Sequence, residues 1–164
     1  MSYTVRRFRP DEAAAFRAVR LDALTTSPEF FASVLADESE RDEAYYAARL
    51  AEQPVWGVFD GEAPVGMAGL NVHEGERKRH KATLWGMYVS PAARGSGVAA
   101  RLIEAVVDHA RAEGLQQVLL TCMAVNTRAR ALYERLGFVQ YGLEPRALRI
   151  GDEVFDDTLM VRRL

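Results

Sequence analysis

The chain has 164 residues, the usual length of one domain, and 49% of them are hydrophobic and 27% charged. This composition can supply a buried core, which excludes a largely disordered or collagen-like chain. Because 21 Lys and Arg are balanced by 23 Asp and Glu, the formal net charge is -2, and no nucleic-acid partner is expected.

Cysteine usage and hydropathy point to the cytoplasm. The single cysteine, Cys122, cannot form an internal disulfide, and the three histidines are too scattered along the chain for a zinc site. No apolar run approaches the roughly 18 residues that cross a bilayer, and the amino-terminal residues lack the apolar stretch of a signal peptide. We therefore expect a cytoplasmic protein with no metal and no membrane partner.

The first half of the chain alternates apolar runs with turn signals. Its predicted elements are a strand over 3–8, a helix over 11–24, a helix over 40–51 and strands over 55–59 and 65–72. The first helix places Ala15, Val19 and Leu24 at near-helical spacing. The last two strands bracket a turn at residues 60–62 that is typical of a hairpin.

The second half repeats strand and helix. Its predicted elements are a strand over 83–89, a helix over 97–112, a strand over 118–123, a helix over 127–136 and strands over 138–150 and 154–161. Gly137 stands where a helix ends, and residues 151–152 suit the turn of a closing hairpin. This order predicts an α/β fold in one domain over residues 1–164, with one mixed sheet of about seven strands and helices on both faces.

A basic segment precedes the strand over 83–89. It contains Arg77, Lys78, Arg79, His80 and Lys81. The run is compatible with a phosphate-binding patch or with a solvated loop between strands. The solvated loop is favoured, because charge runs are usually surface features.

A glycine-rich segment joins that strand to the long helix. Gly95 and Gly97 let the backbone approach a ligand without a Cβ clash, and the following helix offers unpaired N–H groups and the positive end of its dipole. Arg94 adds a guanidinium beside the loop, and its paired N–H donors can bind phosphate oxygens. The segment predicts a cradle for a phosphate, although the same residues suit a plain tight turn.

A dinucleotide-binding site uses a similar loop but fits this chain less well. Such a site requires a third glycine and a ribose-binding acid about 20 residues further on. Here Ala100 occupies the third glycine position, and the region near Gln116 and Gln117 has no acid.

A second group of polar residues follows on the next predicted helix. Asn126 and Tyr133 are seven residues apart, which returns a helix to almost the same azimuth, and Arg130 lies between them on that face. One polar edge can thus face one ligand. Taken singly, Asn126 also suits a helix cap and Tyr133 a core position.

Together these two blocks resemble the GNAT superfamily of N-acetyltransferases. The first matches the acetyl-CoA signature Gln/Arg-x-x-Gly-x-Gly/Ala with Arg94, Gly97 and Ala99. The second, which begins at Asn126, matches every letter of Asn-x-x-Ala-x-x-Leu-Tyr-x-x-x-Gly-Phe. The core of the resemblance spans about residues 81–138.

The resemblance implies a fold in which the fourth and fifth strands splay apart and the pantetheine arm of acetyl-CoA lies in the gap. The glycine-rich loop would take the pyrophosphate, and main-chain groups of Met87 and Val89 would bind the arm. The implied cofactor-binding residues are Met87, Tyr88, Val89, Arg94, Gly95, Ser96, Gly97, Val98, Ala99, Asn126 and Arg130.

The resemblance also implies N-acetyl transfer from acetyl-CoA by direct attack of a primary amine on a small molecule, an amino acid or a peptide amino terminus. A backbone N–H near Met87 would polarise the thioester carbonyl. Tyr133 would protonate the leaving thiolate, since a tyrosine of pKa about 10 keeps its proton at neutral pH. The alternative is a non-catalytic acyl-CoA-sensing or partner-binding domain. The sequence leaves a homodimer open.

The general base of many family members, a Glu on the strand before the glycine loop, is missing. Residues 81–88 contain no acid, and Thr83 could instead order a water. Other candidate bases are Glu38, Glu40, Glu144 and Asp156, although a solvated surface carboxylate is the favoured state of each. Cys122 has no obvious His partner, so a covalent acetyl-cysteine is disfavoured.

The layout of the family implies an acceptor mouth between the N-terminal helices, with Tyr45 and Tyr46, and the C-terminal hairpin. The hairpin carries Glu144, Arg146, Asp156 and Asp157. The mouth is therefore expected to be mixed in charge, which suits an amino acid or a short amino-terminal peptide better than a polyamine.

Overall fold

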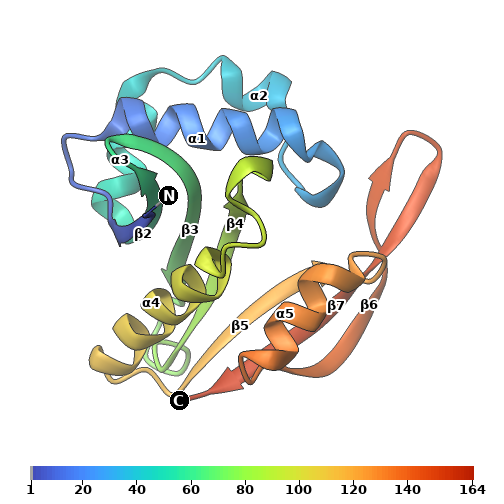
Figure 1. Ribbon diagram of the computed structural model, residues 1–164. Coiled ribbons are helices and arrows are strands. Elements are labelled where there is room, and N and C mark those ends of the chain that lie inside the picture. The colour runs from blue at the N-terminus through green and yellow to red at the C-terminus, as the bar shows by residue number, and fades with distance from the viewer. Residues whose placement is uncertain (1) are drawn as a thin grey trace.

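Seven strands form one mixed sheet in the order β1-β2-β3-β4-β5-β7-β6 (Figure 1). The structure is a computed structural model that describes residues 2–164. The strands are β1 (Thr4–Arg7), β2 (Val55–Asp60), β3 (Ala63–Val72), β4 (Lys81–Val89), β5 (Gln117–Met123), β6 (Val139–Ile150) and β7 (Glu153–Arg163). Strands β4 and β5 pair in parallel, and the other neighbouring strands pair antiparallel. The predicted α/β fold with a mixed sheet is confirmed.

Helices connect the strands largely where periodicity predicts them. They are α1 (Ala13–Thr26), α2 (Leu35–Ser39), α3 (Glu43–Glu52), α4 (Val98–Ala112) and α5 (Thr127–Arg135), with short 3-10 turns η1 (Pro28–Phe30) and η2 (Pro91–Ala93). The sequence does not predict α2, because five residues are too few to show a helical period and its N-cap, Val34, makes no side-chain bond. None of the described helices combines the length and apolarity that crossing a bilayer requires.

The helices cover both faces of the sheet, as predicted. Neighbouring residues of β2 divide between two cores, because side chains alternate along a strand. Val55 and Phe59 pack into the core that α1 and α3 cover. Trp56 and Val58 pack into the core that α4 covers, and Tyr133 of α5 belongs to this second core.

Strands β4 and β5 separate soon after they begin to pair. Residues 81–83 of β4 pair with residues 117–119 of β5, and no further pair follows between the described strands. Beyond this point β4 stays paired with β3 and β5 stays paired with β7. Figure 1 shows the two strands together near the C-terminus and diverging toward the loop before α4. The implied splay between the fourth and fifth strands is confirmed.

Candidate active site

A cleft of about 910 Å³ opens where β4 and β5 separate. Its walls come from β4, β5, the start of α4, the length of α5 and the segment that follows α1, with single residues from α1 and α3. The sequence-predicted site residues that line it are Met87, Tyr88, Val89, Arg94, Gly95, Gly97, Ala99, Asn126 and Tyr133. The structure thus brings most of the predicted residues to one cavity.

Three predicted cofactor-binding residues, Ser96, Val98 and Arg130, lie outside the cleft lining. Val98 is 1% exposed and packs into the core beneath α4. The Ser96 hydroxyl donates to the carbonyl of Ala93 at 2.7 Å. Arg130 donates from Nη1 to the carbonyl of Ala124 at 3.4 Å. The side chains of these residues are therefore engaged within the protein.

The loop before α4 keeps the first turn of that helix open. Gly95 and Gly97 have φ angles of 80° and 81°, a left-handed conformation that favours glycine. A Cβ at either position would meet no described heavy atom within 4 Å, so the backbone conformation and not crowding calls for glycine. Gly97 is the N-cap of α4 and makes no side-chain cap bond, the first turn contains no acid, and the N–H of Val98 makes only a 3.4 Å hydrogen bond to Ser96 Oγ. The N–H groups and the helix dipole therefore favour an anion there.

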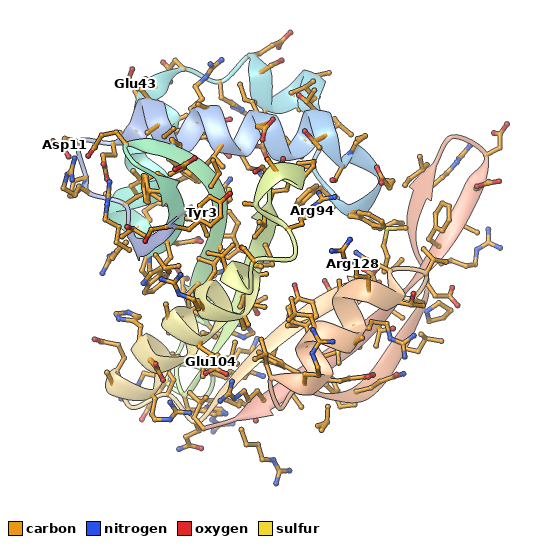
Figure 2. The ribbon with its side chains drawn as sticks, in the orientation of Figure 1. Tyr3, Asp11, Glu43, Arg94, Glu104 and Arg128 are labelled. Atoms are coloured by element: carbon orange, nitrogen blue, oxygen red, sulfur yellow. The ribbon has the colours of Figure 1, made fainter. Side chains whose placement is uncertain are left out.

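Arg94 is held by the protein at the edge of this loop. Its Nε donates to the carbonyl of Val89 at 3.0 Å, and its Nη2 donates to Ser27 Oγ at 3.4 Å. The side chain thus ties the end of β4 to the segment after α1. Figure 2 shows Arg94 and Arg128 on the two sides of the gap between the β4–α4 loop and α5.

A β-bulge interrupts β4 beside the cleft. Trp85 pairs with Gly69 and Tyr88 with Met67, so two residues of β4 lie opposite one residue of β3. One of the two is Gly86, whose φ angle is 65°. Bulges of this kind redirect the backbone and are frequent beside active sites.

Tyr133 lies on α5 against the floor of the cleft. Its side chain is largely buried, and its ring packs edge-on against Phe138 with 5.7 Å between the ring centroids. Burial, with a smaller contribution from Cys122, raises the pKa of the Tyr133 hydroxyl above its usual value. The hydroxyl therefore keeps its proton at neutral pH.

Two other residues near α5 have local structural partners. Asn126 is the N-cap of α5, and its Oδ1 accepts a hydrogen bond from the N–H of Ala129 at 3.2 Å. Burial, followed by the charge of Asp157, raises the pKa of the Cys122 thiol to about 11. A thiol with this pKa is a poor nucleophile at neutral pH, because the thiolate is the reactive form.

The candidate bases Glu38, Glu40, Glu144 and Asp156 do not line the cleft. Glu38 also differs from the expected solvated carboxylate, because it is 6% exposed and its Oε1 lies 2.7 Å from Nη2 of Arg20. Burial alone would raise the pKa of Glu38, but the hydrogen bonds and charge of Arg20 outweigh it and lower the pKa. The charged residues that do line the cleft are Arg20, Arg49, Arg94, Arg128 and Arg135.

The expected acceptor mouth requires correction. Tyr46 is fully buried and its hydroxyl donates to Glu38, while no described residue of the hairpin 139–163 lines the cleft. In their place, α1 contributes Arg20 and α3 contributes Arg49. Arg49 lies one helical turn after Tyr45, but nothing in the sequence marks that face of α3 as the one beside the cleft.

Comparison with known proteins places the chain among acetyltransferases. The family model described as "Acetyltransferase (GNAT) family" matches residues 19–138. Mycothiol acetyltransferase from Salinispora tropica is 31% identical over 144 residues, which are 84% of this chain and 45% of that protein. The chain therefore spans less than half the length of this relative.

Solved structures share the fold over nearly the whole chain. A GNAT-family acetyltransferase from Streptococcus pneumoniae has a TM-score of 0.88 and 22% identity, with 99% of each chain covered. A GNAT superfamily phosphinothricin acetyltransferase from Sinorhizobium meliloti, solved with acetyl-CoA, has a TM-score of 0.81 and 22% identity, covering 100% of this chain and 89% of that chain. With the splayed strands, the glycine loop and the matching family model, this chain belongs to the acetyltransferase (GNAT) family.

Proposed function

We propose that this protein is a cytoplasmic enzyme that transfers the acetyl group of acetyl-CoA to a primary amine by direct attack, with residues 1–164 acting as one catalytic domain and without a metal. The observation that carries the proposal is the cleft between β4 and β5, which joins the N-terminal end of α4 to the buried Tyr133. Acetyl-CoA in the structure of the Sinorhizobium meliloti neighbour supports the choice of cosubstrate.

The residues of the cleft suit the parts of acetyl-CoA. The N–H groups at the start of α4, beyond Gly97, would hold the pyrophosphate, and Arg128 would add a cation from the other side of the gap. The backbone of β4 from Met87 to Val89 would bind the pantetheine arm, because the splay leaves this stretch without a β5 partner.

Tyr133 and the β4 bulge would then supply the chemistry. A backbone N–H near Met87 would stabilise the oxyanion as the amine nitrogen forms a bond to the carbonyl carbon. The amine nitrogen would lose a proton to a water, and Tyr133 would give its proton to the sulfur as the carbon–sulfur bond breaks, which yields the amide and free CoA. Its raised pKa suits a group that must enter the reaction protonated.

The competing function is a domain that binds acyl-CoA without turning it over, and the lack of a carboxylate among the described lining residues favours it. Purified protein incubated with acetyl-CoA and a mixture of amines, with released thiol as the readout, separates the two. Amine-dependent thiol release supports the enzyme. Tight acetyl-CoA binding by calorimetry without any thiol release would favour the binding domain.

A further inference from the structure

We propose that the amine acceptor carries an anionic oxygen group, such as a carboxylate, that Arg20 and Arg49 bind on the α1–α3 side of the cleft. This inference rests on the proposed acetyl transfer and specifies its substrate class. The polar donors that would recognise the acceptor are thus two guanidinium groups and not the mixed charges of the C-terminal hairpin.

The charge of the lining supports this assignment. All of the charged residues among the described lining are arginines. Three of them, Arg94, Arg128 and Arg135, belong to the α4 loop and to α5, where phosphates of acetyl-CoA would lie. Arg20 and Arg49 come from α1 and α3 on the other face of the sheet and are left for the acceptor. The neighbouring carboxylate, Glu38, pairs with Arg20 and does not line the cleft, so the described lining offers a polyamine no carboxylate.

Arg20 is fixed in place by its partners. Glu38 accepts hydrogen bonds from Nε at 3.0 Å and from Nη2 at 2.7 Å, and Phe31 lies against the guanidinium, 5.3 Å from Cζ to the ring centroid. The remaining nitrogen, Nη1, would be 3.5 Å from a Cβ built on Gly86. Nη1 therefore lies beside the β4 bulge, next to the proposed oxyanion site.

Arg49 presents a stacked guanidinium whose charge helps to lower the pKa of Glu38 but which makes no direct ion pair among the described residues. Its Cζ lies 4.3 Å from the centroid of the Trp85 ring, and its Nη1 donates to the Tyr45 hydroxyl at 3.4 Å. No carboxylate of the described chain forms an ion pair with it. Stacking on an aromatic face leaves the in-plane N–H donors of a guanidinium free for a planar oxyanion. A bound carboxylate would thus accept hydrogen bonds from N–H groups of Arg49 that have no carboxylate partner in the protein.

The test compares acceptors that differ only in the anionic group. An apolar amino acid such as L-methionine is compared with its carboxamide, and rates are expressed per deprotonated amine because the two amines differ in pKa. We expect kcat/KM to be at least tenfold higher for the acid. Sulfonate and phosphonate analogues of the amino acid show which oxyanion is preferred.

Variants assign the preference to residues. Arg49→Gln should lower kcat/KM for the acid tenfold or more and leave that for the carboxamide within twofold. Arg20→Lys keeps a cation beside Glu38 but removes the paired N–H donors of the guanidinium. It should also lower kcat/KM for the acid more than for the carboxamide. The matched control is Arg41→Gln, which removes a charge from an exposed residue beside α3 that does not line the cleft.

Two outcomes would overturn the inference. One is an equal kcat/KM for the acid and the carboxamide in the wild type, and the other is an equal loss of kcat/KM for both acceptors in Arg49→Gln. Absence of thiol release with every acceptor contradicts the proposed function itself.

A separate contact leads us to infer a second role, in which His73 accepts the proton of the amine through Thr83. Thr83 lines the cleft on β4, and its Oγ1 is 2.7 Å from Nε2 of His73. Ala82 and Leu84 pack into the α4 core, so Thr83 points to the α1–α3 face with Trp85. The hydroxyl can pass its proton to Nε2 while it takes one from the amine, directly or through a water.

The surroundings of His73 keep its imidazole neutral and able to accept a proton. Burial lowers the pKa of His73, and the charges of Lys81, Lys78 and His80 lower it further. Glu74 is adjacent in the chain and exposed. The neutral imidazole of His73, hydrogen-bonded to the Thr83 hydroxyl, would thus act as the general base in place of the carboxylate that β4 lacks.

This role is tested by the pH dependence of variants. His73→Gln and Thr83→Val should each lower kcat/KM tenfold or more at pH 7, with no further loss in the double variant, while Thr83→Ser retains activity. The deficits should shrink as the pH approaches the pKa of the amine, because a deprotonated amine needs no base. His109→Gln, on α4 and outside the cleft lining, is the matched control. A loss of equal size at every pH, or no loss at all, would contradict the relay.

Discussion

The guanidinium of Arg94 and the carbonyl of Val89 form a 3.0 Å hydrogen bond that joins the loop before α4 to the last residue of β4. Removing it should loosen the cradle without disturbing the core, because Arg94 is exposed. We expect Arg94→Ala to weaken acetyl-CoA binding about tenfold by calorimetry, or about 1.4 kcal/mol. Arg101→Ala, an exposed change further along α4 and outside the cleft lining, is the control. Unchanged affinity would mean that the bond has no part in shaping the cradle.

A side chain at Gly97 should exclude the pyrophosphate from the first turn of α4. Gly97→Val is expected to weaken acetyl-CoA binding tenfold or more, which is about 1.4 kcal/mol or above. The left-handed backbone also strains any substituted side chain, at a cost of about 1–2 kcal/mol in stability. Gly75→Val provides a matched control for that strain, since Gly75 has a φ angle of 91° and equally open surroundings. If both variants fold and bind acetyl-CoA like the wild type, the pyrophosphate lies elsewhere.

Tyr133 should matter for chemistry and not for binding. Tyr133→Phe keeps the ring against Phe138 and removes the acidic proton. We expect acetyl-CoA affinity to persist while kcat falls by roughly two orders of magnitude. Phe138→Leu, which changes the packing neighbour and keeps the hydroxyl, separates a packing effect from the loss of the acid. A Tyr133→Phe enzyme with wild-type kcat would leave Tyr133 as a core residue only.

The sequence predicts the fold and the cofactor side of the cleft better than the acceptor side, for a physical reason. Gly97 and Tyr133 belong to short contiguous blocks in which spacing alone fixes their relation to a strand or a helix. Arg20 and Glu38, by contrast, meet across 18 residues and two helices, so no local spacing reveals that Glu38 is a buried ion-pair partner and not a surface acid. The position of Arg49 beside the cleft could not be predicted from the sequence either, because it depends on how α3 packs against the rest of the protein.

Acid should destabilise the protein partly through Glu12. The hydrogen bond from Arg6 is the largest influence on Glu12 and, with the Arg9 N–H, lowers its pKa to about 2 against the opposing effect of burial. Because the unfolded chain has the ordinary pKa near 4.5, it binds this proton more readily than the folded protein does. The contribution of Glu12 is therefore complete above about pH 4.5 and is lost as the pH falls toward 2.

The measurement is the free energy of unfolding by urea between pH 6 and pH 2. We expect stability to fall with acid in the wild type, and Glu12→Gln should make the fall shallower because that titration is removed. Glu153→Gln, at an exposed position on β7, should leave the slope as it is in the wild type. Identical slopes for Glu12→Gln and the wild type would show that the Arg6–Glu12 contact does not hold the carboxylate in its charged form. A steeper slope in Glu12→Gln would contradict the sign of the shift.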